Sequence, residues 1–167
     1  MAQISTSDFK NGMTVDLDDG LFQISEFQHL VLTERIRATP DQVFDFLVEP
    51  EKLLRWMGTE AKIDPTPGGD FWLNVNGENI AVGKYVTVER PHRVVLTWGW
   101  QDSPHVPPGS TEVTFTLTAD GDETVVELVH AGLPLGPEDE HKDGWTYFLD
   151  RMSRAVAGEQ LPAPGPH

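Results

Sequence analysis

The sequence contains no cysteine among its 167 residues, and it is poor in basic side chains. Without cysteine the chain has no disulfides, no thiolate chemistry and no cysteine-ligated metal. Its 12 lysines and arginines stand against 27 acidic residues, which gives a formal net charge of −15. That charge excludes binding driven by nucleic-acid phosphates or by an anionic membrane. It is typical of a well-solvated surface or, as the alternative, of a surface that binds a basic partner.

Long apolar segments and a secretory leader are also missing. No run approaches the roughly 20 apolar residues that cross a bilayer, so no membrane insertion is expected. The first residues show no basic region followed by an apolar one, which is the arrangement of a signal peptide. We therefore expect a cytoplasmic protein whose length suits one domain with a core of ordinary size.

Composition divides the chain into three parts. Residues 1–29 contain two short strand-like stretches around the Asp-Gly turn at Asp19 and Gly20, which predicts an appended hairpin. Residues 30–158 form the main domain. The Pro-rich residues 159–167 are predicted to be a disordered tail.

The main domain begins with a strand over residues 30–37 and continues with helix signals. Thr39 is a cap, Pro40 suits the first helical position, and Gln42 completes a capping box. Pro50 ends this helix and opens a second short one, which Gly58 closes. Tight turns and one longer loop at 101–110 then separate a series of expected strands: 71–76, 79–89, 93–100, 112–119 and 124–130.

The end of the domain predicts a long amphipathic helix. Apolar residues recur at positions 145, 148, 149, 152 and 156, the spacing of one helix face. Short antiparallel strands followed by such a helix predict an α+β fold, with the helix laid across a curved sheet. This arrangement can leave a cavity between the sheet and the helix.

The main domain resembles the START-like superfamily, also called Bet v 1-like or SRPBCC, which has a helix-grip fold. Within it the chain resembles bacterial proteins similar to the C-terminal domain of the activator of the heat-shock protein 90 ATPase. An ordered series of segments carries the resemblance over residues 30–158: Ala38–Phe44, Glu49–Met57, Pro67–Phe71, Gly83–Trp98, Val113–Leu117, His130–Leu133 and Gly144–Trp145.

The superfamily implies a cavity between the sheet and the long helix, but it does not imply one activity. Its members include lipid carriers, ligand-sensing proteins, aromatic polyketide cyclases and a chaperone-regulating domain, and fold alone does not settle function.

Residues 1–29 are similar to the N-terminus of bacterial translation elongation factor P. The similarity rests on Ile4–Thr6, Asp8–Met13 and Glu26–His29, and it stops there. The basic, glycine-rich loop that follows in that factor is not found in this chain. The similarity therefore implies no function in translation.

Alternation along the strands and the helix periodicity place a group of aromatic and polar side chains on inner faces. They could line a pocket for an apolar or flat ligand, or they could simply fill the core. The candidate ligand-binding residues are Trp56, Phe71, Trp98, Trp100, His130, His141, Trp145, Phe148 and Met152.

His130 is the one candidate catalytic residue, at the end of an apolar inner face. It could bind a ligand or act as an acid or base near neutral pH, and the alternative is a core histidine bonded within the protein. His141 lies four residues before Trp145, either at the pocket mouth or in solvent. Scattered histidines without metal-binding spacing predict no metal, and no cofactor is expected.

Three functions remain open from the sequence. The first is binding of a small apolar or aromatic molecule without catalysis, because no convincing acid, base or nucleophile pair is present. The second is a cyclase, dehydratase or hydrolase that uses His130. The third is a protein-interaction module, such as a chaperone regulator or stress-response partner, in which the acidic surface meets a basic partner.

Overall fold

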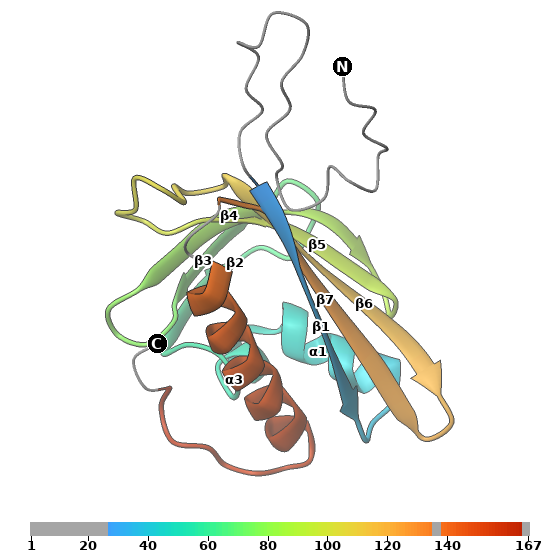
Figure 1. Cartoon of the computed structure of the whole chain (residues 1–167). Helices are drawn as coiled ribbons and strands as arrows, with labels where there is room; N and C mark the ends of the chain where they lie inside the picture. The colour runs from blue at the N-terminus through green and yellow to red at the C-terminus, as the bar shows by residue number, and fades with distance from the viewer. Residues whose placement is uncertain (1–26, 135–137, 165–167) are drawn as a thin grey trace, which may run out of the picture.

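The computed structural model describes residues 27–134 and 138–164. They form a seven-stranded antiparallel sheet, which curves over the helices in Figure 1. In chain order the elements are β1 (Phe27–Ile36), α1 (Pro40–Val48), α2 (Pro50–Leu53), β2 (Glu60–Ile63), β3 (Asp70–Asn74), β4 (Ile80–Glu89), β5 (Arg93–Trp98), β6 (Thr111–Asp120), β7 (Glu123–Pro134) and α3 (Glu138–Val156).

The strand order in the sheet is β1-β7-β6-β5-β4-β3-β2. Strands β2 to β7 are therefore a meander. The first strand, β1, pairs along its length with the last strand, β7. This confirms the α+β helix-grip fold. The short strand β2 was not predicted from the sequence, because its four residues include only two apolar ones. The predicted strand through Trp100 ends earlier, at Trp98.

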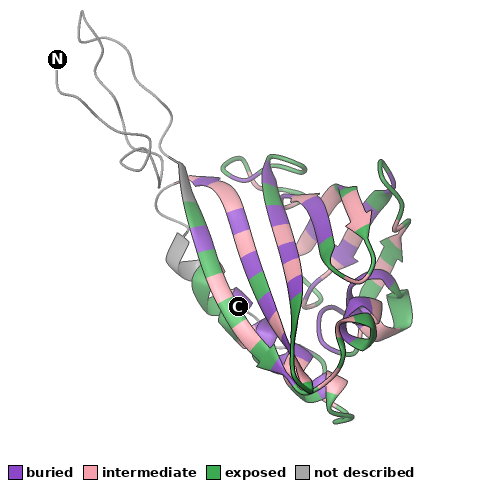
Figure 2. Ribbon diagram, turned by 90° about the vertical axis from the view of Figure 1, so that its right-hand side faces the viewer, coloured by how far each residue is buried: buried purple, intermediate pink, exposed green. Residues whose placement is uncertain are grey.

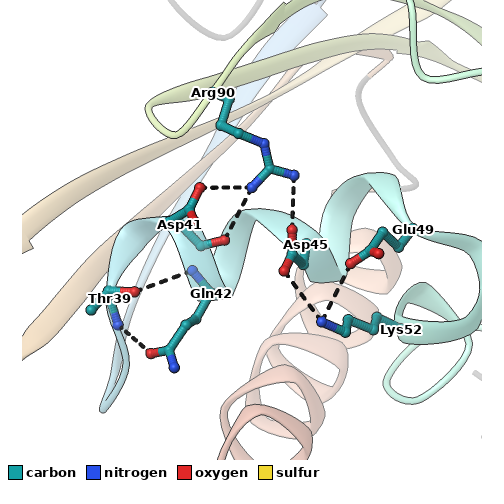
Figure 3. A network of polar contacts seen from close by, with 7 residues as sticks. All are labelled: Thr39, Asp41, Gln42, Asp45, Glu49, Lys52 and Arg90. Carbon is teal, nitrogen blue, oxygen red and sulfur yellow. Dashed lines mark hydrogen bonds and ion pairs between the residues drawn. The ribbon is translucent and has the colours of Figure 1, made fainter.

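The capping box at the start of α1 is formed as predicted. The Thr39 hydroxyl accepts a hydrogen bond from the Gln42 amide, and the Gln42 side chain accepts one from the Thr39 amide. Figure 3 shows that Arg90, from the turn after β4, reaches two carboxylates of this helix, at 2.7 Å from Asp41 and 2.8 Å from Asp45. These contacts attach the β4–β5 turn to α1.

The predicted alternation of the strands is visible in the burial of their side chains. Buried and more exposed residues alternate along several strands in Figure 2. On β7 the buried set includes Val126, Leu128 and His130, each 0% exposed. On β3, Phe71 and Leu73 are buried, whereas the Trp72 ring lies half-buried beneath the Lys62 ammonium.

The helix α3 lies against the inner face of the sheet with the predicted stripe. Trp145, Phe148, Leu149 and Met152 are all buried, and Val156 packs partly buried at the end of the stripe. Among the described residues no helix is long and apolar enough to cross a membrane.

The structure describes the two predicted appendages to different extents. The predicted hairpin within residues 1–29 lies almost entirely outside the described residues. The predicted disordered tail is residues 159–167, of which the structure describes 159–164. In this part Leu161 packs against the core and Pro164 is buried. Burial of apolar area stabilises such contacts.

Candidate ligand site between the sheet and the C-terminal helix

An aromatic cluster occupies the space between the end of β5 and the start of α3. Trp98 lies at its centre, with ring centroids 5.1 Å from Trp145, 5.4 Å from Trp100 and 5.7 Å from Phe71. Strand β5 brings Trp98 to the inner face, and the first turns of α3 bring Trp145 over it. Tilted and edge-on pairs of this kind stabilise the cluster beyond the area that they bury.

Behind the cluster, His130 joins β6, β7 and α3 through a fully buried relay. The Trp145 indole N–H donates to Nδ1 of His130 at 3.0 Å. Nε2 of His130 lies 2.8 Å from the Thr111 hydroxyl, and that hydroxyl donates to the Trp98 carbonyl at 2.7 Å. Because the Thr111 proton is already used, Nε2 must carry the donated proton. The relay therefore fixes one neutral tautomer of His130.

The electrostatics of His130 agree with this neutral form. Its complete burial, and secondarily the nearby charge of His141, hold the pKa of His130 well below 6.5. A buried imidazole loses the hydration that stabilises its charged form, so protonation is disfavoured. With both ring nitrogens occupied and the proton held tightly, His130 is built as a structural residue rather than as a free acid or base.

Trp98 carries an unusual polar atom. Its indole Nε1 is enclosed and has no hydrogen-bond partner, and it is the one such side-chain atom found in the described part of the chain. A buried donor without an acceptor costs about 1–3 kcal/mol. The packing of its aromatic neighbours therefore sets the ring position, and the N–H group is left without a hydrogen bond.

A cavity of about 440 Å³ opens beside this cluster, at the N-terminal end of α3. Its inner wall is aromatic, with Trp98, Trp100 and Trp145 on one side. The Trp100 N–H donates to Nε2 of His141 at 3.0 Å, which joins the loop after β5 to α3 across the wall. Apolar residues and glycine also line it: Met57, Val75, Ile80, Val106, Gly144 and Phe148. The polar lining residues are mostly exposed, and we call them the rim: Asn76, Glu78, Asn79, Gln101, Asp102, Ser103 and His105.

Five of the nine candidate ligand-binding residues line this cavity: Trp98, Trp100, His141, Trp145 and Phe148. The other four do not line it. Trp56 is buried with its N–H on the Phe46 carbonyl at 2.8 Å, Phe71 packs behind Trp98, His130 lies in the relay, and Met152 is wholly enclosed two helical turns further along α3. These four residues belong to the core because the cavity occupies only one end of the space between helix and sheet.

Sequence reasoning missed the residues of the rim. They come from the β3–β4 turn, with Asn76 and Asn79, and from the loop after β5, with Gln101 and Ser103. The run of prolines and glycine at 104–109 marks that loop as long, but nothing local indicates that it lines a cavity together with α3. The Ser103 hydroxyl accepts the amide of Val106, which closes the loop into a compact turn.

Comparison with known proteins identifies the family. A family model described as activator of Hsp90 ATPase homolog 1-like protein matches residues 37–157. An activator of 90 kDa heat shock protein ATPase homolog from Dictyostelium discoideum is 28% identical over 133 residues, which cover 77% of this chain and 33% of that protein. The chain thus spans about a third of the length of the curated relatives it matches.

Solved structures extend this similarity to three dimensions. An AHSA1-like protein from Rhizobium etli is 39% identical with a TM-score of 0.66, over 84% of this chain and 87% of that one. CalU16 from Micromonospora echinospora is 27% identical with a TM-score of 0.68, over 89% of this chain and 83% of that one. The comparisons lend no support to the similarity of residues 1–29 to elongation factor P.

Proposed function

We propose that this chain, which belongs to the family of activator of Hsp90 ATPase homolog 1-like proteins, binds a small apolar or aromatic molecule in the cavity beside Trp98. The observation that carries the proposal is the cavity itself, about 440 Å³ in volume and walled by three indole rings. Sites for small organic molecules have volumes of about 300–1,000 Å³, with apolar walls and a few polar groups that fix orientation.

The polar groups of the cavity lie mainly at its rim, which favours a ligand with an apolar body and a polar end. Asn76, Asn79 and Gln101 offer amide groups at this rim. The interior is lined by buried apolar residues that include Val75, Trp98 and Trp145. Apolar area removed from water contributes about 25 cal/mol per Å², so the aromatic wall would supply most of the affinity.

Catalysis by His130 is not part of the proposal. Both of its ring nitrogens are hydrogen-bonded inside the protein, and Trp98 and Trp145 lie at its ring, with centroid distances of 6.1 Å and 6.0 Å. A general base needs a proton to take within hydrogen-bond reach, and His130 has no vacant nitrogen for one.

Gly144 provides a sharp test, because it lines the cavity and a Cβ at this helical position would meet nothing within 4 Å. We expect Gly144→Leu to fold well, since glycine costs a helix about 1 kcal/mol relative to alanine. Its side chain should fill part of the cavity and weaken binding of the neutral aromatic probe N-phenyl-1-naphthylamine about tenfold, equivalent to about 1.4 kcal/mol. Probe fluorescence gives the affinity.

The matched control is Gly144→Ala, which adds only one methyl group at the same position. It should bind the probe within about twofold of the parent chain, because such a small loss of space costs well under 1.4 kcal/mol. Equal probe affinity in the parent chain and in Gly144→Leu would show that the probe binds elsewhere and would remove the proposal.

A second candidate function is binding to the heat-shock protein 90 chaperone. The family description and the Dictyostelium relative favour it, and the net charge of −15 would suit a basic partner surface. Titration calorimetry with purified chaperone should then show an affinity that falls as the salt concentration rises. Exposed charges are screened over about 8–10 Å at ionic strengths of about 0.1–0.15 M. Absence of heat at both low and high salt would exclude this candidate.

A further inference from the structure

A second hollow lies next to residues 159–164, the C-terminal stretch of the described chain. Its volume is about 580 Å³. The segment after α2 forms one wall with Leu54, Arg55 and Gly58, α3 contributes Arg151, and residues 159–164 form the remaining wall. Figure 1 shows the chain turning back after the end of α3. We call this hollow the Arg151 groove.

Arg151 is a buried cation that has no counter-ion among the described residues. It is 4% exposed, its Nε donates to the Trp56 carbonyl at 2.9 Å, and its guanidinium carbon lies 5.7 Å from the centre of the Tyr147 ring. No described carboxylate forms an ion pair with it, and no described group accepts from Nη1 or Nη2. Neither nitrogen is an enclosed atom without a partner, and Arg151 lines the groove, so we infer that they face it.

A buried guanidinium without a carboxylate partner in the described part of the chain is unexpected here. Acidic residues outnumber basic ones by 27 to 12, and Arg35, Arg90 and Arg154 each contact a carboxylate. Burying a charge without a partner is strongly unfavourable unless a counter-ion compensates for the lost hydration. The position of Arg151 therefore points to a negative group that is supplied from outside the described residues.

A second arginine faces the same groove. Arg55 donates through Nη2 to the Ala155 carbonyl at 3.1 Å and lies over the Phe46 ring, and no described carboxylate pairs with it. One acidic residue, Glu159, also lines the groove, but Arg154 holds it at 3.2 Å and offsets its charge. The groove thus combines two guanidinium groups with one carboxylate that is already paired.

We propose that the Arg151 groove binds the oxyanion of a small molecule, a carboxylate or a phosphate group, between Arg151 and Arg55. With Nε of Arg151 committed to Trp56, its two terminal nitrogens form the parallel fork that matches two oxygens of one oxyanion. Leu54, Leu161 and Pro162 also line the groove and would provide apolar contacts for the remainder of the ligand. This site shares no lining residue with the cavity beside Trp98.

The test measures binding of inorganic phosphate and of butyrate by calorimetry, at constant ionic strength with chloride as the reference anion. We expect at least one of them to bind, and which one binds distinguishes a phosphate ligand from a carboxylate. Arg55→Gln should weaken that binding about tenfold, because a hydrogen bond to a charged group contributes about 1.5–3 kcal/mol. Glu159→Gln should strengthen it.

Arg93→Gln is the matched control, because it removes the same charge from an exposed position on β5 that has no described ion pair. It should leave the affinity within about twofold, as expected for a distant screened charge. Arg151→Gln should abolish binding, and Arg55→Gln carries the test if Arg151→Gln does not fold. Absence of binding by both anions, or equal weakening by Arg93→Gln and Arg55→Gln, would overturn the proposal.

Discussion

The neutral, buried state of His130 predicts a specific loss of stability in mild acid. Both ring nitrogens are engaged, Nδ1 with Trp145 and Nε2 with Thr111, and burial holds the pKa of His130 well below its ordinary value of 6.5. The unfolded chain exposes the same imidazole, which then titrates normally. Below pH 6.5 the unfolded state therefore binds one more proton than the folded state at this position.

The sign and size of the effect follow from this difference. Because the unfolded state takes up the extra proton, the free energy of unfolding rises with pH across this window and falls as the pH is lowered. Between pH 7.5 and 5.5 the loss amounts to about 1.4 kcal/mol for a group that titrates at 6.5 only when unfolded. The loss continues until the pH approaches the depressed pKa of the folded state.

Urea unfolding at a series of pH values measures this loss in the parent chain and in His130→Gln. Glutamine can accept from Trp145 and donate to Thr111 but does not titrate, so the other ionisable groups cancel in the comparison. The parent chain should lose about 1.4 kcal/mol more than the variant between pH 7.5 and 5.5. Identical pH dependences would refute the neutral relay, as would an NMR titration of the His130 ring that follows an ordinary pKa.

Three further results are expected. Thr39→Ala should lower the free energy of unfolding by about 1 kcal/mol in urea titrations, because the capping box of α1 loses its side-chain acceptor, whereas Thr39→Ser should retain most of it. Gly83→Ala should lower the thermal stability by the equivalent of at least about 2 kcal/mol, because its Cβ would collide with the Thr97 carbonyl; an unchanged melting temperature would contradict that packing. Saturating phosphate should change the affinity for the naphthylamine probe by less than about twofold, since the two sites share no lining residue, and a larger change in the fluorescence titration would show that they are coupled.

Elements that depend on local signals could be predicted from the sequence. Thr39, Pro40 and Gln42 specify the start of α1 through contacts within one turn, and the structure confirms each of them. The period of two on β7 and the helical period of α3 identify the buried faces, because a buried face imposes its spacing on the sequence. The fold class follows from these elements in their chain order.

The position of the cavity could not be predicted in the same way. The helical period shows that Trp145 and Met152 share a face, but it does not show that the cavity ends between them. That limit depends on how the loop around Ser103 and the turn at Asn76 come to line one cavity with the start of α3, although these segments are far apart in the chain. Arg151 was also missed, because an arginine beside an apolar stripe is usually exposed. Its burial goes with the position of residues 159–164, which the local sequence does not indicate.

The hydrogen bonds of the indole groups decide which kind of ligand the cavity suits. Trp145 directs its N–H away from the cavity to His130, and Trp100 uses its N–H on His141. The N–H of Trp98 is enclosed and cannot reach a ligand without a movement of the ring. All three indoles therefore face the cavity mainly with carbon atoms, although tryptophan is often placed in sites for its donor. Recognition inside would then depend on shape and apolar contact, while selection among polar ligands would fall to the amides at the rim.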